Sequence, residues 1–88
     1  MDSALQQSIR TKIIQLGQAR GLGIANLDND VLLLEAGVLD SASVLELVVW
    51  LEATLGVEID LGALTIENFG SVNRMADFVE ADQRQVEE

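Results

Sequence analysis

Between Ser41 and Leu55 the chain has the pattern of a helix that is apolar on nearly every side. At about 100° per residue, one face is wholly aliphatic and is expected to be core; it comprises Val44, Leu47, Val48, Leu51 and Leu55. The opposite face and its flanks mix small, apolar and acidic residues, namely Ala42, Leu45, Glu46, Val49, Trp50 and Ala53. A chain of 88 residues is too short to cover one helix all round. We therefore predict that this second face meets a partner protein.

The remainder of the chain is predicted to complete an all-α four-helix bundle. Helical spacing of apolar residues predicts long helices over 3–19 and 72–84, and a short helical turn over 65–69. The connection over 20–40 is unusually long and rich in apolar side chains, so it should pack across the helix ends. No repeat or linker divides the chain, which indicates one domain over 1–88.

Glycine and hydroxyl residues mark the expected helix ends. Gly56 should end the helix that begins near Ser41, and Thr65 and Ser71 should cap the last two helices. The turn after Gly56 is expected to point its apolar residues inward, namely Val57, Ile59 and Leu61.

The composition removes most catalytic and metal chemistry. Histidine and cysteine are absent, so the chain lacks the commonest general base, the commonest metal ligand and any thiolate nucleophile. Asp28 and Asp30 suggest a calcium loop, but Leu32 and Leu33 stand where that loop needs a further oxygen ligand and a glycine. We expect neither an enzyme nor a metal site.

Acidic residues dominate the middle of the chain. The net charge is −10, and nine Asp and Glu residues but no Lys or Arg lie between Gly21 and Asn73. Such a surface repels nucleic acids and anionic membranes and attracts basic patches on proteins, although it also simply keeps a small apolar protein soluble. The first residues lack the layout of a signal peptide, and no apolar run is long enough to span a membrane. We expect a cytoplasmic monomer without membrane insertion.

Ser41 is open to two interpretations. It is either an ordinary N-cap, with Ser43 and Glu46 forming a capping box, or a functional site. The interpretation as a cap leaves three features unexplained. These are the acid Asp40 directly before Ser41, the apolar second face of the helix, and the unbroken acidic surroundings.

This part of the chain resembles the acyl carrier protein family. The resemblance rests on the pair Asp40-Ser41 and the residues that follow it, namely Val44, Leu45, Glu46, Leu47, Val48, Leu51 and Glu52. It extends through the aliphatic first helix, the long loop, the Gly-Val-Glu-Ile turn and the short third helix. The implied fold is the family's four-helix bundle, with three long helices, one short helix and a long first loop.

The resemblance implies a role for each residue at the start of the helix. Ser41 is implied to carry phosphopantetheine, attached from coenzyme A by a phosphopantetheinyl transferase, and Asp40 to assist recognition by that transferase through its magnesium. The arm's thiol then holds a thioester that an acyl- or aminoacyl-activating ligase supplies and that downstream acyl-transferring enzymes use. The implied docking face comprises Ala42, Leu45, Glu46, Val49 and Glu52. The alternative class is an acidic helical adaptor without a prosthetic group, in which Ser41 is only a cap.

The residues around Ser41 also bear on the subtype. Fatty-acid carriers usually have a leucine after the serine, whereas this chain has Ala42. The lead-in from Glu35 to Ser41 looks more like D-alanyl and other stand-alone aminoacyl carriers. We therefore expect an aminoacyl or short-acyl carrier, with fatty-acid synthesis as the alternative subtype. Trp50 is unusual, and we expect it to be a lid on the core rather than a partner contact.

Overall fold

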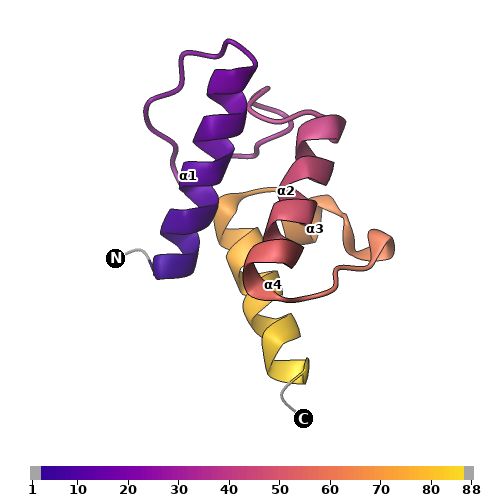
Figure 1. The fold of residues 1–88 in the computed structure, drawn as a ribbon. Coiled ribbons are helices and arrows are strands. Elements are labelled where there is room, and N and C mark those ends of the chain that lie inside the picture. Colours follow the sequence, from indigo (N-terminus) through magenta and orange to yellow (C-terminus); the bar gives the residue numbers. More distant parts are fainter. Residues whose placement is uncertain (1–2, 87–88) are drawn as a thin grey trace.

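The computed structural model describes residues 3–86, and this part of the chain contains helices and no strand (Figure 1). The elements are α1 (Ala4–Ala19), α2 (Ser41–Leu55), the 3-10 helix η1 (Leu61–Ala63), α3 (Ile66–Phe69) and α4 (Val72–Val86). The predicted all-α architecture with three long helices, one short helix and a long first loop is confirmed. α4 continues to Val86, past the predicted end at residue 84. Residues 1–2 and 87–88 of the predicted domain lie outside the described range. None of the described helices is long and apolar enough to cross a membrane.

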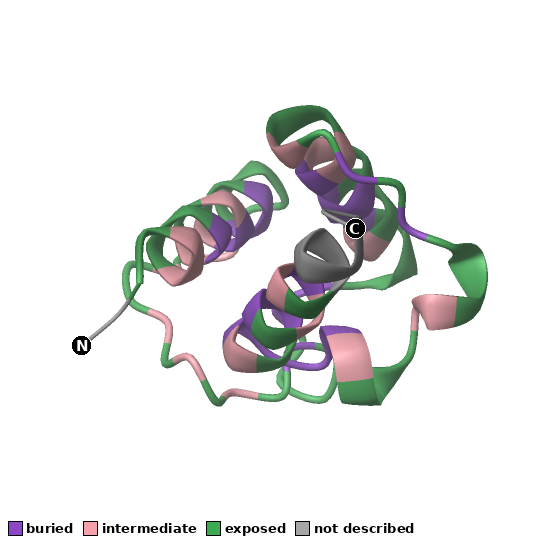
Figure 2. Ribbon diagram, turned by 90° about the horizontal axis from the view of Figure 1, so that it is seen from below, coloured by how far each residue is buried: buried purple, intermediate pink, exposed green. Residues whose placement is uncertain are grey.

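One aliphatic core holds the helices together. The sides of the helices that face one another carry the buried residues (Figure 2). The most deeply buried side chains are Ile9, Ile13, Leu33, Leu47, Leu51, Val72, Met75 and Val79. Burial of each such side chain contributes roughly 1.5–3 kcal/mol. This packing fixes one face of α2 against the core and leaves the other face outward.

Most helix ends follow the expected local chemistry. Thr65 accepts a hydrogen bond from the third amide of the α3 turn, and the hydroxyl of Ser71 accepts one from the third amide of α4 at 3.2 Å. Gly56 ends α2 in the left-handed region with φ of 67°, a conformation that glycine adopts without steric cost. The beginning of α2 differs from expectation and belongs to the site described below.

The long loop is ordered against the junction of α3 and α4. The fully buried Leu33 donates its backbone N–H to the carbonyl of Gly70 at 2.9 Å. Asn29 accepts from the backbone N–H of Asn73 at 3.1 Å, which ties an earlier part of the loop to α4. The backbone N–H groups of Val38 and Leu39 both donate to the Leu33 carbonyl, at 3.0 and 3.2 Å. The loop therefore reaches α2 along a defined path.

Leu61 does not point inward as predicted. Val57 and Ile59 are buried, but Leu61 is 72% exposed. The inward alternation stops because Asp60 caps η1, accepting a hydrogen bond from the Gly62 N–H at 3.4 Å, and the tight 3-10 turn directs Leu61 to the surface.

Candidate functional site

The N-cap of α2 is Asp40 and not Ser41. The backbone of Asp40 is extended, and its Oδ1 accepts a hydrogen bond from the Ser43 N–H at 2.8 Å. The Asp40 carbonyl accepts from the Val44 N–H at 2.9 Å. The interpretation of Ser41 as the cap, with Ser43 and Glu46 as a capping box, is therefore wrong, because the preceding carboxylate already satisfies the amide that a cap must reach. Ser41 is instead the first residue of the helix.

Ser41 presents an exposed hydroxyl at the positive end of α2. Its side chain has no hydrogen-bond partner among residues 3–81, the part of the chain whose side chains the structure describes. The first amides of a helix lack intrahelical acceptors, and the helix dipole favours negative charge beside them. An exposed primary alcohol in this place fits a phosphodiester, because the neighbouring N–H groups and the dipole stabilise an anion attached to it.

Asp40 is a partly exposed carboxylate with two neighbours. Its Oδ2 lies 3.6 Å from Nη2 of Arg20, and its side chain is 53% exposed. The backbone N–H and then the hydroxyl of Ser43 lower the pKa of Asp40 below its ordinary value, and the charge of Arg20 lowers it further. The carboxylate is thus ionised at neutral pH. Among the side chains that the structure describes, those of residues 3–81, it belongs to no cluster of three or more His, Cys, Asp or Glu residues that could hold a metal.

Arg20 contacts this site, and sequence reasoning gave it no role. Besides its approach to Asp40, its Nη1 donates a hydrogen bond to the carbonyl of Val38 at 3.0 Å. The only sequence signal is that Arg20 is the last cation before the long acidic stretch.

The residues expected to form the docking face lie along α2, but Glu52 is also a structural contact. Ala42 and Glu46 are exposed, and the large apolar side chains of Leu45 and Val49 are 49% and 63% exposed. Glu52 is only half-exposed, because its Oε2 accepts a hydrogen bond from the Ile59 N–H at 2.8 Å across the turn that follows α2.

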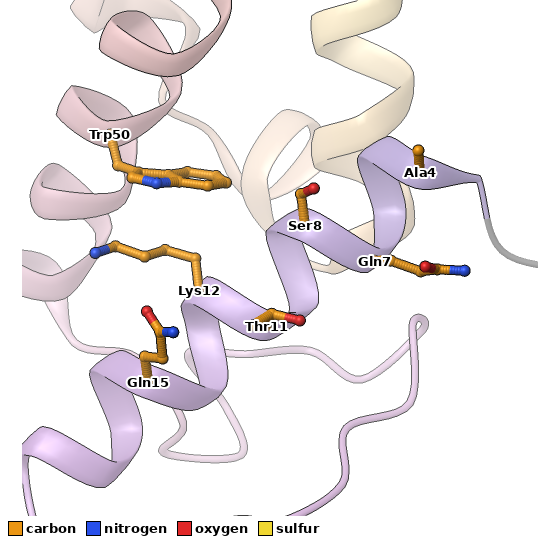
Figure 3. Close-up of a pocket in the computed structure, with 7 residues that line it drawn as sticks. All are labelled: Ala4, Gln7, Ser8, Thr11, Lys12, Gln15 and Trp50. Carbon is orange, nitrogen blue, oxygen red and sulfur yellow. The ribbon is translucent and has the colours of Figure 1, made fainter.

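A groove between α1 and α2 borders this surface, and both Trp50 and Lys12 line it. The indole of Trp50 extends from α2 over α1, with the Lys12 side chain beside it (Figure 3). A shallow, open depression of about 480 Å³ follows the polar residues of α1, and another of about 430 Å³ follows the outer face of α2. Trp50 is half-buried and packs against the core, as expected of a lid.

Two small cavities lie where the long loop meets α3. They measure about 90 and 40 Å³ and share Leu34, Ile66 and Gly70 in their walls. Val44, from the first turn of α2, lines the larger one.

The sequence was also compared with known protein families. Residues 19–79 match the sequence model of a family described as phosphopantetheine attachment site. The matched range begins at the end of α1, contains all of α2 and α3, and ends within α4. No curated protein matches the chain closely enough to count as a relative.

Proposed function

Because the chain belongs to the acyl carrier protein family, whose members bear a covalently attached phosphopantetheine, we propose that Ser41 is the residue that bears it. The protein is a carrier and not an enzyme, so the reactions at its cargo belong to partner enzymes. One observation carries the choice of residue. Asp40 supplies the cap of α2, which leaves the exposed Ser41 hydroxyl without a structural task.

In the proposed modification the hydroxyl oxygen of Ser41 forms a bond to the phosphorus that carries the pantetheine arm of coenzyme A. The pyrophosphate bond breaks, the nucleotide half of coenzyme A leaves, and the hydroxyl proton passes to a base on the transferase. The chain itself contains no His or Cys that could act as this base. The amides at the start of α2 stabilise the new phosphodiester. When present, the arm supplies a thiol that holds the cargo as a thioester.

Asp40 is proposed to be the recognition element for the transferase. Its Oδ1 is engaged by Ser43, while the side chain as a whole remains 53% exposed. An ionised, accessible carboxylate beside the reacting hydroxyl suits contact with a magnesium ion that the transferase brings.

The outer face of α2 is proposed to be the docking surface. Leu45 and Val49 offer apolar area, and Glu46 offers charge complementary to basic residues of a partner. Ala42 lies next to Ser41, and its small side chain adds little bulk beside the hydroxyl that a partner must reach. Glu52 borders the surface while bracing the turn at Ile59. The proposed partners are the phosphopantetheinyl transferase, an acyl- or aminoacyl-activating ligase and downstream acyl-transferring enzymes.

The proposed cargo is an aminoacyl or short acyl group. Cavities of about 90 and 40 Å³ between the long loop and α3 offer little space for a long chain, and Ala42 stands where fatty-acid carriers usually have leucine. An octanoyl group on the arm should leave the amide chemical shifts of Val44 and Phe69 unchanged. Large shifts at both amides would favour the fatty-acid subtype instead.

An intact-mass measurement tests the site. The purified chain is incubated with coenzyme A, magnesium and a broad-specificity phosphopantetheinyl transferase. The unsubstituted chain and Thr54→Ala, a control at an exposed hydroxyl near the other end of α2, should each gain one phosphopantetheine, and Ser41→Ala should gain none. Modification of Ser41→Ala would overturn the assignment.

A further inference from the structure

Arg20 joins the end of α1 to the residues that lead into α2. Arg20 is the C-cap residue of α1, and its backbone N–H donates to the Gly17 carbonyl at 3.1 Å. Its guanidinium reaches across the loop, donating from Nη1 to the Val38 carbonyl at 3.0 Å and placing Nη2 3.6 Å from Oδ2 of Asp40. A planar, forked group makes two such contacts at once, whereas a lysine ammonium cannot match both.

The lead-in to Ser41, here residues 38–40, makes contacts on two sides. On one side, the backbone carbonyl of Leu33 accepts hydrogen bonds from the N–H groups of Val38 and Leu39. On the other side, Arg20 binds the Val38 carbonyl and the Asp40 carboxylate. No Lys or Arg occurs between Gly21 and Asn73, so no cation in that stretch could make these contacts instead of Arg20.

We infer that Arg20 is a positioning residue for the modification of Ser41. It fixes the backbone at Val38 and the direction of the Asp40 carboxylate, so that a transferase meets an ordered segment. Binding an ordered segment avoids the entropic cost of fixing it in the complex. Arg20 acts through Asp40 and the loop and not on the reacting hydroxyl. The inference rests on the proposed function.

The charge of Arg20 and its positioning role have opposite effects on modification. A transferase that recognises this acidic carrier is attracted by negative charge, so removal of a cation alone should speed association or leave it unchanged. Loss of positioning should weaken productive binding. Arg74→Gln separates the two effects, because it makes the same change in charge and also removes a guanidinium hydrogen bond to a backbone carbonyl, that of Ile66 at 3.2 Å, which does not involve residues 38–40.

The first test is steady-state kinetics of modification with the unmodified chain as the varied substrate. Arg20→Gln should raise KM about threefold to tenfold with little change in kcat, as expected from the loss of one to two modest polar contacts. Arg74→Gln should not raise KM, and Arg20→Lys should fall between Arg20→Gln and the unsubstituted chain. Equal KM values for Arg20→Gln and Arg74→Gln would overturn the inference. Failure to modify the unsubstituted chain would instead refute the proposed function.

The second test needs no transferase. Native-state hydrogen exchange at the amides of Val38 and Leu39 should be faster in Arg20→Gln than in the unsubstituted chain, while exchange at core amides such as Leu47 stays unchanged. This pattern would show local release of the lead-in rather than global destabilisation. Unchanged exchange at both loop amides would refute the positioning role even if modification were slower.

Discussion

Substitutions of Ser41 and Asp40 are expected to separate modification from folding. Asp40 caps α2 through the Ser43 N–H at 2.8 Å, whereas the Ser41 hydroxyl has no partner among residues 3–81. Ser41→Ala should therefore abolish modification and leave the fold intact. Asp40→Ala should destabilise the fold, and Asp40→Asn should retain most of the cap because asparagine caps helices about as well as aspartate.

The magnitudes follow from the contacts that each substitution removes. Ser41→Ala removes no hydrogen bond and replaces serine by the best helix former, so the free energy of unfolding should change by at most about 0.5 kcal/mol. Asp40→Ala leaves the Ser43 amide without its acceptor and also removes the ion pair to Arg20. For a domain of this size the loss of a cap should lower the melting temperature by roughly 4–8 °C.

The effect of Asp40 should also depend on pH. Its folded-state pKa is lowered from 3.8 by Ser43 and then by Arg20, so its ionised form stabilises the folded state. This stabilisation is present above the unfolded-state pKa and is lost as the pH falls through the lower folded-state value. The difference in stability between the unsubstituted chain and Asp40→Asn should therefore be present at neutral pH and disappear in acid.

Thermal unfolding followed by far-ultraviolet circular dichroism measures both effects. Each variant is melted at neutral pH and again at a pH well below 3.8, so that Asp40 is protonated in the folded state despite its lowered pKa. A loss of melting temperature in Ser41→Ala as large as that in Asp40→Ala would show that Ser41 contributes the cap after all. It would refute the reasoning on which the site assignment depends.

Three further predictions concern the acidic surface. Glu52→Ala should lower the free energy of unfolding by about 1 kcal/mol in a denaturant titration, because the Ile59 N–H loses its acceptor. Glu46→Ala should leave it unchanged, and equal effects would contradict a structural role for Glu52 alone. Glu46→Lys should slow association with the transferase in stopped-flow measurements, more at low salt than at high salt, and an unchanged rate would remove Glu46 from the docking surface. Added salt should raise the melting temperature by screening the net charge of −10, and a melt indifferent to ionic strength would refute this self-repulsion.

The positions of the helices and much of the core could be predicted from the sequence. The apolar spacing over 41–55 followed by Gly56 predicts both ends of α2, and Leu47 and Leu51 are completely buried in it. These features depend on residues that are close in sequence. Hydrophobic periodicity and local capping chemistry therefore suffice to locate them.

Competing caps and long-range contacts could not be predicted in this way. Asp40 and Ser41 are both good cap residues, and only the backbone shows which of them has the extended conformation that a cap requires. Glu52 looks like a docking acid until the chain turns back and brings the Ile59 amide to it. Arg20 meets residues 38–40 because a long loop folds back to the end of α1, which no local pattern records.

The most direct test of the carrier assignment is to locate the added mass within the modified, unsubstituted chain. Proteolysis after Glu35 and Glu46 releases the peptide 36–46, which contains Ser41 and Ser43. Fragmentation that breaks the chain between these two serines distinguishes them. We predict that the phosphopantetheine mass lies on Ser41. Its presence on Ser43 or outside this peptide, or its absence from a folded chain, would contradict the assignment.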